Sequence, residues 1–161
     1  MYRPLTFLFF AIISLASLLS LLAVFKALFT ERVNKIEQAL NDGLARNFWL
    51  GLVNTLVLIG LAAILTSASE STGFTLISVL AVAILGIYLV GLTLGLSALS
   101  QYLGGRLLPA REGLAAQWRG GLALALAALT PYVGWFLLLP YALCLSFGAF
   151  IAVAVQDRRA R

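Results

Sequence analysis

Long apolar runs separated by short polar segments set the pattern of this chain. The runs at residues 4–29, 48–66 and 74–103 are each long enough, at about 1.5 Å per helical residue, to cross a hydrocarbon core of about 30 Å. A last apolar stretch, from Gly120 to Val155, would be about 54 Å long as one straight helix, which exceeds even a strongly tilted span. The pattern therefore predicts an all-α integral membrane protein, with residues 1–161 forming a single polytopic domain.

The last stretch contains a predicted break at Thr130-Pro131. Threonine is a good N-cap, proline is favoured at the first helical position, and proline disfavours helical geometry in the residue before it. Gly134 suits a tight turn, and Pro140 is expected to kink the helix that follows. The chain is then predicted to have five transmembrane helices, a lead helix plus two helical hairpins, with the last two spans at about residues 114–129 and 131–155.

An alternative arrangement keeps four spans, with a kinked last helix. The weak part of the five-span prediction is the segment 114–130, because only about 17 Å of helix separates Arg119 from Pro131. This segment either crosses the membrane fully or is re-entrant, and a re-entrant segment must be buried against protein because lipid cannot satisfy irregular backbone.

The basic residues provide an independent indication of topology. With five spans, ten of the eleven basic residues lie on one side of the membrane and Arg3 alone lies on the other. With four spans, the C-terminal arginines change sides and the division is seven against four. The positive-inside rule therefore predicts a multi-pass protein of the inner (plasma) membrane with its N-terminus outside and its C-terminus cytoplasmic, whose basic loops meet anionic lipid headgroups.

An amphipathic segment, residues 30–42, follows the first apolar run. Val33, Ile36 and Leu40 continue one helical stripe, so the first helix is expected to extend beyond the membrane for about three turns. Lys26 is expected to extend toward the membrane interface, and Gly43 is expected to stop the helix in a left-handed conformation. The stripe would rest on the lipid surface or neighbouring loops, or form a short coiled-coil contact with a partner.

Composition narrows the classes of function. Apolar residues make up 62% of the chain and charged residues 11%, and the mean hydropathy is +1.03. There is no histidine, and Cys144 is the single cysteine, so no disulfide framework, metal cluster or cofactor site is predicted. We find no nucleophile with a plausible base and no clustered carboxylates, and therefore expect a protein that is not an enzyme. The basic residues are scattered among apolar spans, which argues against nucleic acid as a partner.

Small and polar residues within the spans are candidates for helix packing. Gly91 and Gly95 form a G-x-x-x-G motif, and Gly148 lies on a similar small face of the last span. We expect these glycines to pack helices within the chain, or otherwise to form a homo-oligomer or partner interface. Asn54 is the clearest intramembrane polar residue, and it is expected to make a hydrogen bond between helices or to line a polar pathway.

Residues 45–155 resemble a known kind of membrane domain. The segments "RNFWLGLVNTLVL", "GLSALSQYLGGRLL" and "LALAALTPYVGWFLLLPYALCLSFGAFI" are similar to the polytopic C-terminal membrane domain of bacterial bactofilin-like, polymer-forming proteins. The most specific part is the Pro-x-x-Gly turn from Pro131 to Gly134, followed by Gly148-Ala149. The resemblance implies an anchoring role without catalytic residues, although those proteins also carry a β-helical domain that has no counterpart in this sequence.

Two functions are consistent with these features. The first is a non-catalytic accessory, scaffolding or anchoring subunit in a bacterial-type inner membrane. The second is a small oligomeric transporter or channel for a hydrophobic or neutral substrate.

Overall fold

The computed structural model describes residues 3–72, 75–107, 114–130 and 132–159, and these residues form helices without any strand. The elements in chain order are α1 (Arg3–Leu28), α2 (Thr30–Asp42), α3 (Leu44–Thr72), α4 (Thr75–Leu107), α5 (Leu114–Leu129), the π-helical turn η1 (Gly134–Leu138) and α6 (Leu139–Arg159). The predicted all-α class is confirmed. The polar loop expected after residue 66 is helical as far as Thr72, and α4 continues through Gly104 and Gly105.

Among the residues that the structure describes, three helical stretches are long and apolar enough to cross a membrane, namely Leu44–Ser69, Val79–Leu107 and Gly134–Arg158. A fourth is added if Ile13–Leu28 and Thr30–Asp42, which meet at an angle of 105°, are taken as one broken span. α5 is not among them, because its 16 residues extend only about 24 Å, short of a core of about 30 Å. These lengths support a membrane protein with three to four spans.

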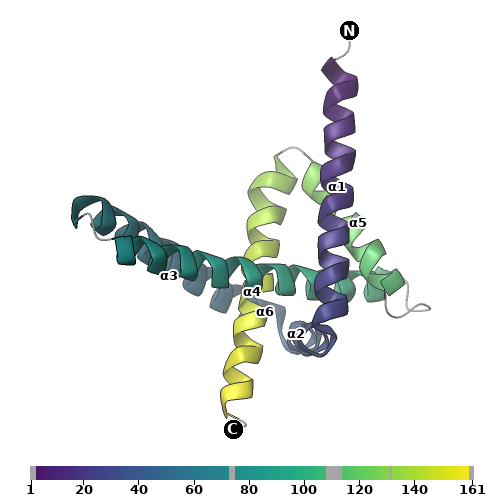
Figure 1. Ribbon diagram of the computed structural model, residues 1–161. Coiled ribbons are helices and arrows are strands. Elements are labelled where there is room, and N and C mark those ends of the chain that lie inside the picture. Colours follow the sequence, from purple (N-terminus) through teal and green to yellow (C-terminus); the bar gives the residue numbers. More distant parts are fainter. Residues whose placement is uncertain (1–2, 73–74, 108–113, 131, 160–161) are drawn as a thin grey trace.

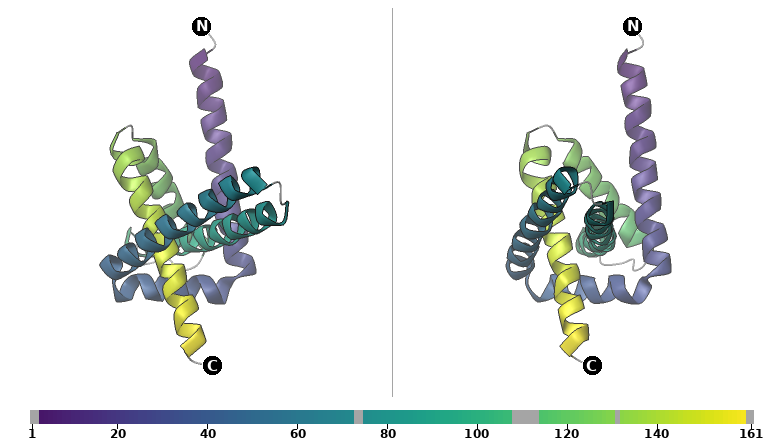
Figure 2. Two further views of the ribbon diagram at one scale, coloured as in Figure 1. Left: turned by 90° about the vertical axis from the view of Figure 1, so that its left-hand side faces the viewer. Right: turned by 60° about the vertical axis from the view of Figure 1, so that its left-hand side comes forward.

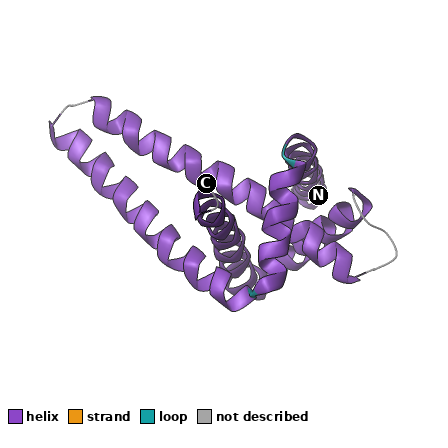
Figure 3. Cartoon of the chain, turned by 90° about the horizontal axis from the view of Figure 1, so that it is seen from below, coloured by secondary structure: helices purple, strands orange, loops and turns teal. Residues whose placement is uncertain are grey.

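The helices run in two main directions. α1 and α6 are roughly aligned, while α3 and α4 form a long antiparallel hairpin that crosses them steeply and projects to one side (Figure 1). Seen from below, the hairpin extends well beyond the remaining helices (Figure 3). α2 closes the base of the arrangement, between the end of α1 and the start of α3 (Figure 2).

The junction of α1 and α2 differs from the sequence prediction. The first helix does not continue straight through residues 30–42; it bends by 105° at Phe29, and the hydroxyl of Thr30 donates a hydrogen bond to the carbonyl of Lys26 (2.8 Å) at the bend. The bend folds the predicted stripe back onto the protein. Val33, Ile36 and Leu40 are buried in the main apolar cluster with residues of α4 and α6. Packing of these side chains against α4 and α6 removes more apolar surface from water than contact with the lipid surface would.

The end of α2 also departs from expectation in one detail. α2 ends at Asp42 and Gly43 follows it, as predicted, but Gly43 has an extended backbone (φ 169°) rather than a left-handed one. The connection to α3 is therefore a single residue, which leaves α2 and α3 in direct succession.

Glycines allow the backbones of three pairs of helices to touch: α3 with α6, α4 with α5, and α4 with α6. In the crossing of α3 and α6, a Cβ atom on Gly51 would overlap the carbonyl group of Cys144, and a Cβ atom on Gly148 would overlap the carbonyl of Asn47. In the pairing of α4 with α5, a Cβ atom on Gly104 or on Gly120 would likewise overlap a backbone carbonyl of the opposite helix. Any side chain at these positions would force the helices apart.

The glycines singled out from the sequence lie at helix contacts within the chain. Gly148 is in the α3–α6 crossing, Gly95 faces the backbone of Ser146 on α6, and Gly91 faces the rings of Phe147 and Phe150. The G-x-x-x-G motif of α4 therefore packs against α6.

The chain reverses direction between α5 and α6. α5 ends at Leu129, and the amide of Gly134 donates to the carbonyl of Thr130 (3.0 Å). The left-handed residue of the turn is Tyr132 (φ 68°). Gly134 is required for a different reason, because a Cβ atom there would lie 2.5 Å from the carbonyl oxygen of Ala127. Pro131 lies outside the described residues.

Thr130 has a different role from the predicted N-cap. Its hydroxyl donates to the carbonyl of Ala127 (2.6 Å), so it satisfies the end of α5, and no side chain caps the following helix. The predicted disturbance at Pro140 takes the form of the π-helical turn just before it. There the amide of Leu139 bonds to the carbonyl of Gly134, five residues back, which accommodates the missing amide of the proline.

Alanine substitution tests the close helix crossings. Gly51→Ala and Gly104→Ala are expected to lower the free energy of unfolding by about 1–3 kcal/mol, because each methyl group overlaps a backbone carbonyl. The matched controls are Gly60→Ala and Gly86→Ala in the same two helices, where a Cβ atom meets nothing within 4 Å. The controls should be neutral or slightly stabilising, since alanine favours the helix. Thermal unfolding in detergent measures both effects, and equal losses at all four positions would contradict the assignment.

Candidate functional site

The buried side chains of Ser97 and Ser100 on α4 and Gln117 on α5 meet the backbone of α1 at Leu22, and Lys26 is buried one turn farther along α1. We call these four polar side chains, Lys26, Ser97, Ser100 and Gln117, the polar junction. The side-chain amide of Gln117 donates to the carbonyl of Leu22 (2.7 Å) and to the hydroxyl of Ser97 (2.8 Å). The Ser97 hydroxyl also donates to the carbonyl of Leu22 (3.0 Å), and Ser100 donates to the carbonyl of Ser97 (2.8 Å). In apolar surroundings, polar groups are satisfied only by one another, so this network fixes the three helices in register.

Lys26 is the charged member of the polar junction. It is only 6% exposed, and its ammonium group has no hydrogen-bond partner within the described residues. The Glu37 carboxylate on α2 interacts with it electrostatically. The predicted extension of Lys26 toward the interface is therefore wrong. The bend at Phe29 places α2 below the end of α1, and the lysine is enclosed rather than directed outward.

A second polar contact attaches α2 to α4. Gln101 donates from its side-chain amide to the Glu37 carboxylate and to the side-chain oxygen of Asn34 (3.3 Å). In the same part of α2, Lys35 forms an ion pair with Asp157 of α6 (2.9 Å). α2 is therefore held by polar contacts to two helices in addition to its buried apolar stripe.

Asn47 is the polar residue that fixes the connection of α2 to α3. It is fully buried, and its amide donates to the carbonyl of Ala39 (2.6 Å). The sequence offered one signal for it: Asn47 stands at the start of an apolar run, beside Arg46 and Phe48. We did not predict this role, because its partner carbonyl belongs to another helix.

Asn54 does not make the hydrogen bond between helices that the sequence suggested. Its amide donates to the carbonyl of Leu50 (2.8 Å), one turn back in the same helix. Gln117 makes the expected kind of bond instead. The sequence did not indicate this role, since a lone glutamine in a short helix gives no local sign of its partner.

An apolar cavity of about 430 Å³, here called the apolar slot, lies between α1, α4, α5 and α6. Leucines of α1, α4 and α6, such as Leu22, Leu103 and Leu139, form most of its walls. The face contributed by α5 is rich in alanine, including Ala123 and Ala127. Leu22 connects the two features, because its backbone carbonyl belongs to the polar junction while its side chain lines the slot.

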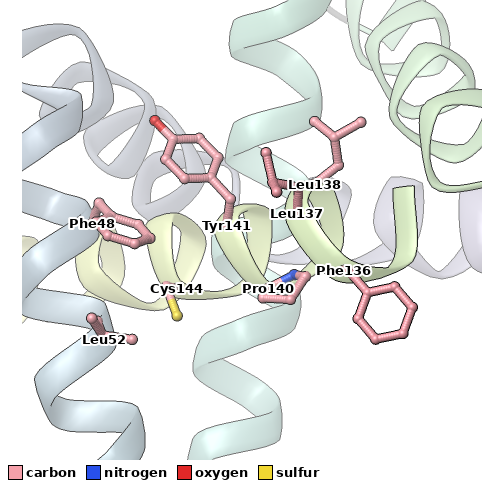
Figure 4. A pocket seen from close by; sticks show the side chains of 8 residues that line it. All are labelled: Phe48, Leu52, Phe136, Leu137, Leu138, Pro140, Tyr141 and Cys144. Atoms are coloured by element: carbon pink, nitrogen blue, oxygen red, sulfur yellow. The ribbon is translucent and has the colours of Figure 1, made fainter. Parts of the chain in front are cut away.

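A shallower apolar groove of about 490 Å³ lies where α3 meets η1 and the start of α6 (Figure 4). Phe48 and Leu52 of α3 line one side, and Phe136, Pro140 and Tyr141 line the other. Phe136 is 77% exposed, so this groove opens to the surroundings. Cys144 lies among the apolar side chains of the groove and is itself buried.

No group of three or more His, Cys, Asp or Glu side chains that could hold a metal ion occurs in the part of the chain that the structure describes. The polar junction offers hydrogen bonding between helices, and the two apolar hollows offer contact with apolar molecules.

Comparison with known proteins gives no family for this chain, since no protein-family model, curated protein or solved structure matches it.

The polar junction predicts unequal effects of two similar substitutions. Gln117→Leu is expected to lower the free energy of unfolding by about 1–2 kcal/mol, because it removes two donors from a buried network. Asn54→Leu, whose bond lies within its own helix, is expected to change it by less than about 0.5 kcal/mol. Unfolding of the two variants in the same detergent checks the difference. A larger loss for Asn54→Leu would show that the junction is not the stabilising contact.

Proposed function

We propose that this protein is a non-catalytic accessory, scaffolding or anchoring subunit of a bacterial-type inner membrane. The observation that carries the proposal is the projecting hairpin of α3 and α4 (Figure 3). Its two helices carry many exposed large apolar side chains, among them Leu56, Val57, Ile64, Val82 and Ile87. A surface of this kind is covered by lipid or by helices of another protein.

Two glycines of the hairpin favour a protein partner. In the part of the chain that the structure describes, a Cβ atom at Gly60 of α3 or at Gly86 of α4 would meet no atom within 4 Å, so both positions are open. Other glycines of the same two helices are used for close contacts inside the chain. Small residues on an exposed transmembrane surface let a second helix approach closely. The resemblance to the membrane domain of polymer-forming proteins agrees with an anchoring role.

The proposed partner contact is tested by enlarging these glycines. Gly60→Leu and Gly86→Leu should leave the fold intact, since both positions are open, and should remove the proteins or second copies that co-purify with the wild type in mild detergent. The control is Ala45→Leu, which enlarges an exposed side chain at the start of α3, about four helical turns from Gly60. Unchanged complexes in the glycine variants would contradict docking on the hairpin.

A second function, transport of a hydrophobic or neutral substrate by an oligomer, is favoured by the apolar slot. Substrate flux by the purified protein in liposomes, without a co-purifying partner, would support transport over scaffolding.

We further propose five spans, with the N-terminus outside and the C-terminus cytoplasmic. The charge distribution supports this topology, because it places ten of eleven basic residues on one side, where the exposed ones can contact anionic headgroups. The chain reversal between α5 and α6 agrees with it.

Single cysteines test this topology. In a Cys144→Ala background, Arg158→Cys and Arg106→Cys should react with a membrane-impermeant thiol reagent from the cytoplasmic face, and Tyr132→Cys, at a position that is 80% exposed, from the outer face. A reporter fused after Arg161 should likewise report a cytoplasmic location. Labelling of Arg158→Cys from outside, with Arg106→Cys still labelled from inside, would show four spans instead.

A further inference from the structure

We infer that the apolar slot holds one acyl chain of a phospholipid from the surrounding bilayer, whether or not the α3–α4 hairpin docks a protein. The slot is formed by four helices and has a volume of about 430 Å³, within the range of sites that enclose small molecules. It exists because α5 presents alanines where its neighbours present leucines. Ala123 and Ala127, one turn apart, leave the space that larger side chains would fill.

The slot favours a hydrocarbon over water or a vacant space. Its lining residues are all leucine or alanine, so a water molecule inside would lack the two to four polar partners that it needs. A vacant slot would deprive its walls of close contacts. Acyl chains are the apolar molecules always present around membrane-spanning helices, and an unbranched chain fits between helices without displacing them.

The shape and position of the slot identify the occupant further. Its lining on α4 extends from Leu96 to Leu107, about 16 Å along the helix, which matches an elongated chain. Leu107 lines the slot and is 58% exposed, and Leu138 and Leu139 at the other end are also exposed, so the slot is open to its surroundings at both ends. Arg106, next to Leu107 at the end of α4, is exposed and is stacked on the ring of Tyr102 (4.7 Å from the ring centre). A guanidinium at the opening suits the phosphate of a phospholipid.

The polar junction lies beside the slot and not at its Leu107 end, because Ser97 follows Leu96 at the opposite limit of the lining on α4. Gln117 and Ser97 bond to each other and to the carbonyl of Leu22, so the contact with the headgroup is left to Arg106 at the end of α4. The chain would enter at Leu107 and extend toward Ala128 and Leu138.

Native mass spectrometry of the full chain tests this inference. The wild type, purified in mild detergent, should retain one phospholipid per chain, identified after extraction. Ala123→Leu with Ala127→Leu fills the slot and should reduce retention roughly tenfold or more. The control pair Ala63→Leu with Ala83→Leu adds the same volume on exposed faces of α3 and α4 and should retain the lipid as the wild type does.

Ala127→Leu alone should give an intermediate reduction, and it replaces the double variant if that protein is poorly recovered. A further measurement is independent of retention: added phospholipid should raise the melting temperature of delipidated wild type but not that of the filled variant. The inference is overturned if the wild type retains no phospholipid, if a different molecule is recovered, or if filled and control variants retain the lipid equally.

Discussion

Direct contact between helix backbones, made possible by glycine, is the constraint on which the rest of this structure depends. At the crossing of α3 and α6, Gly51 and Gly148 each touch a backbone carbonyl of the opposite helix, and Gly104 and Gly120 do the same between α4 and α5. Inside a membrane the hydrophobic effect does not drive helices together, because lipid tails are as apolar as the side chains. Close approach of backbones then supplies the van der Waals contact, and it also fixes where along each helix the crossing lies.

Buried polar groups add the specificity that apolar contact lacks. Gln117 and Ser97 both donate a hydrogen bond to the carbonyl of Leu22, so the position of α1, α4 and α5 along one another is fixed at this point. Asn47 similarly ties α3 to the carbonyl of Ala39 in α2. A slide of any of these helices by one turn would leave an amide without a partner, which is costly in an apolar environment. Lys26 depends on the same arrangement, because only the fold of α2 beneath α1 brings Glu37 near it.

The steep crossing of α3 and α4 over α1 and α6 divides the molecule into a helical cluster and a projecting hairpin (Figure 1). Helices that cross steeply cannot all follow one bilayer normal, so a common membrane requires some of them to tilt strongly. α4 takes part in both the cluster and the hairpin, because Leu96, Leu103 and Leu107 in its second half line the apolar slot, while exposed apolar side chains such as Ile64 of α3 and Val82 of α4 lie nearer the tip of the hairpin. The two proposed contacts, with lipid in the slot and with a partner along the hairpin, therefore use different residues.

The sequence by itself determined the all-helical class, the membrane-length apolar helices and the apolar stripe of Val33, Ile36 and Leu40, because length and periodicity are local properties of a chain. It also located the break after Leu129, where proline chemistry is local too. Only the tertiary structure decided the bend at Phe29 and the burial of Lys26. It also decided that Gln117, and not Asn54, makes the hydrogen bond between helices, and which of the glycines touch a neighbouring backbone. Gln117 lies 95 residues from its partner carbonyl. No local pattern encodes a contact of that kind, since its energy depends on where two separate helices cross.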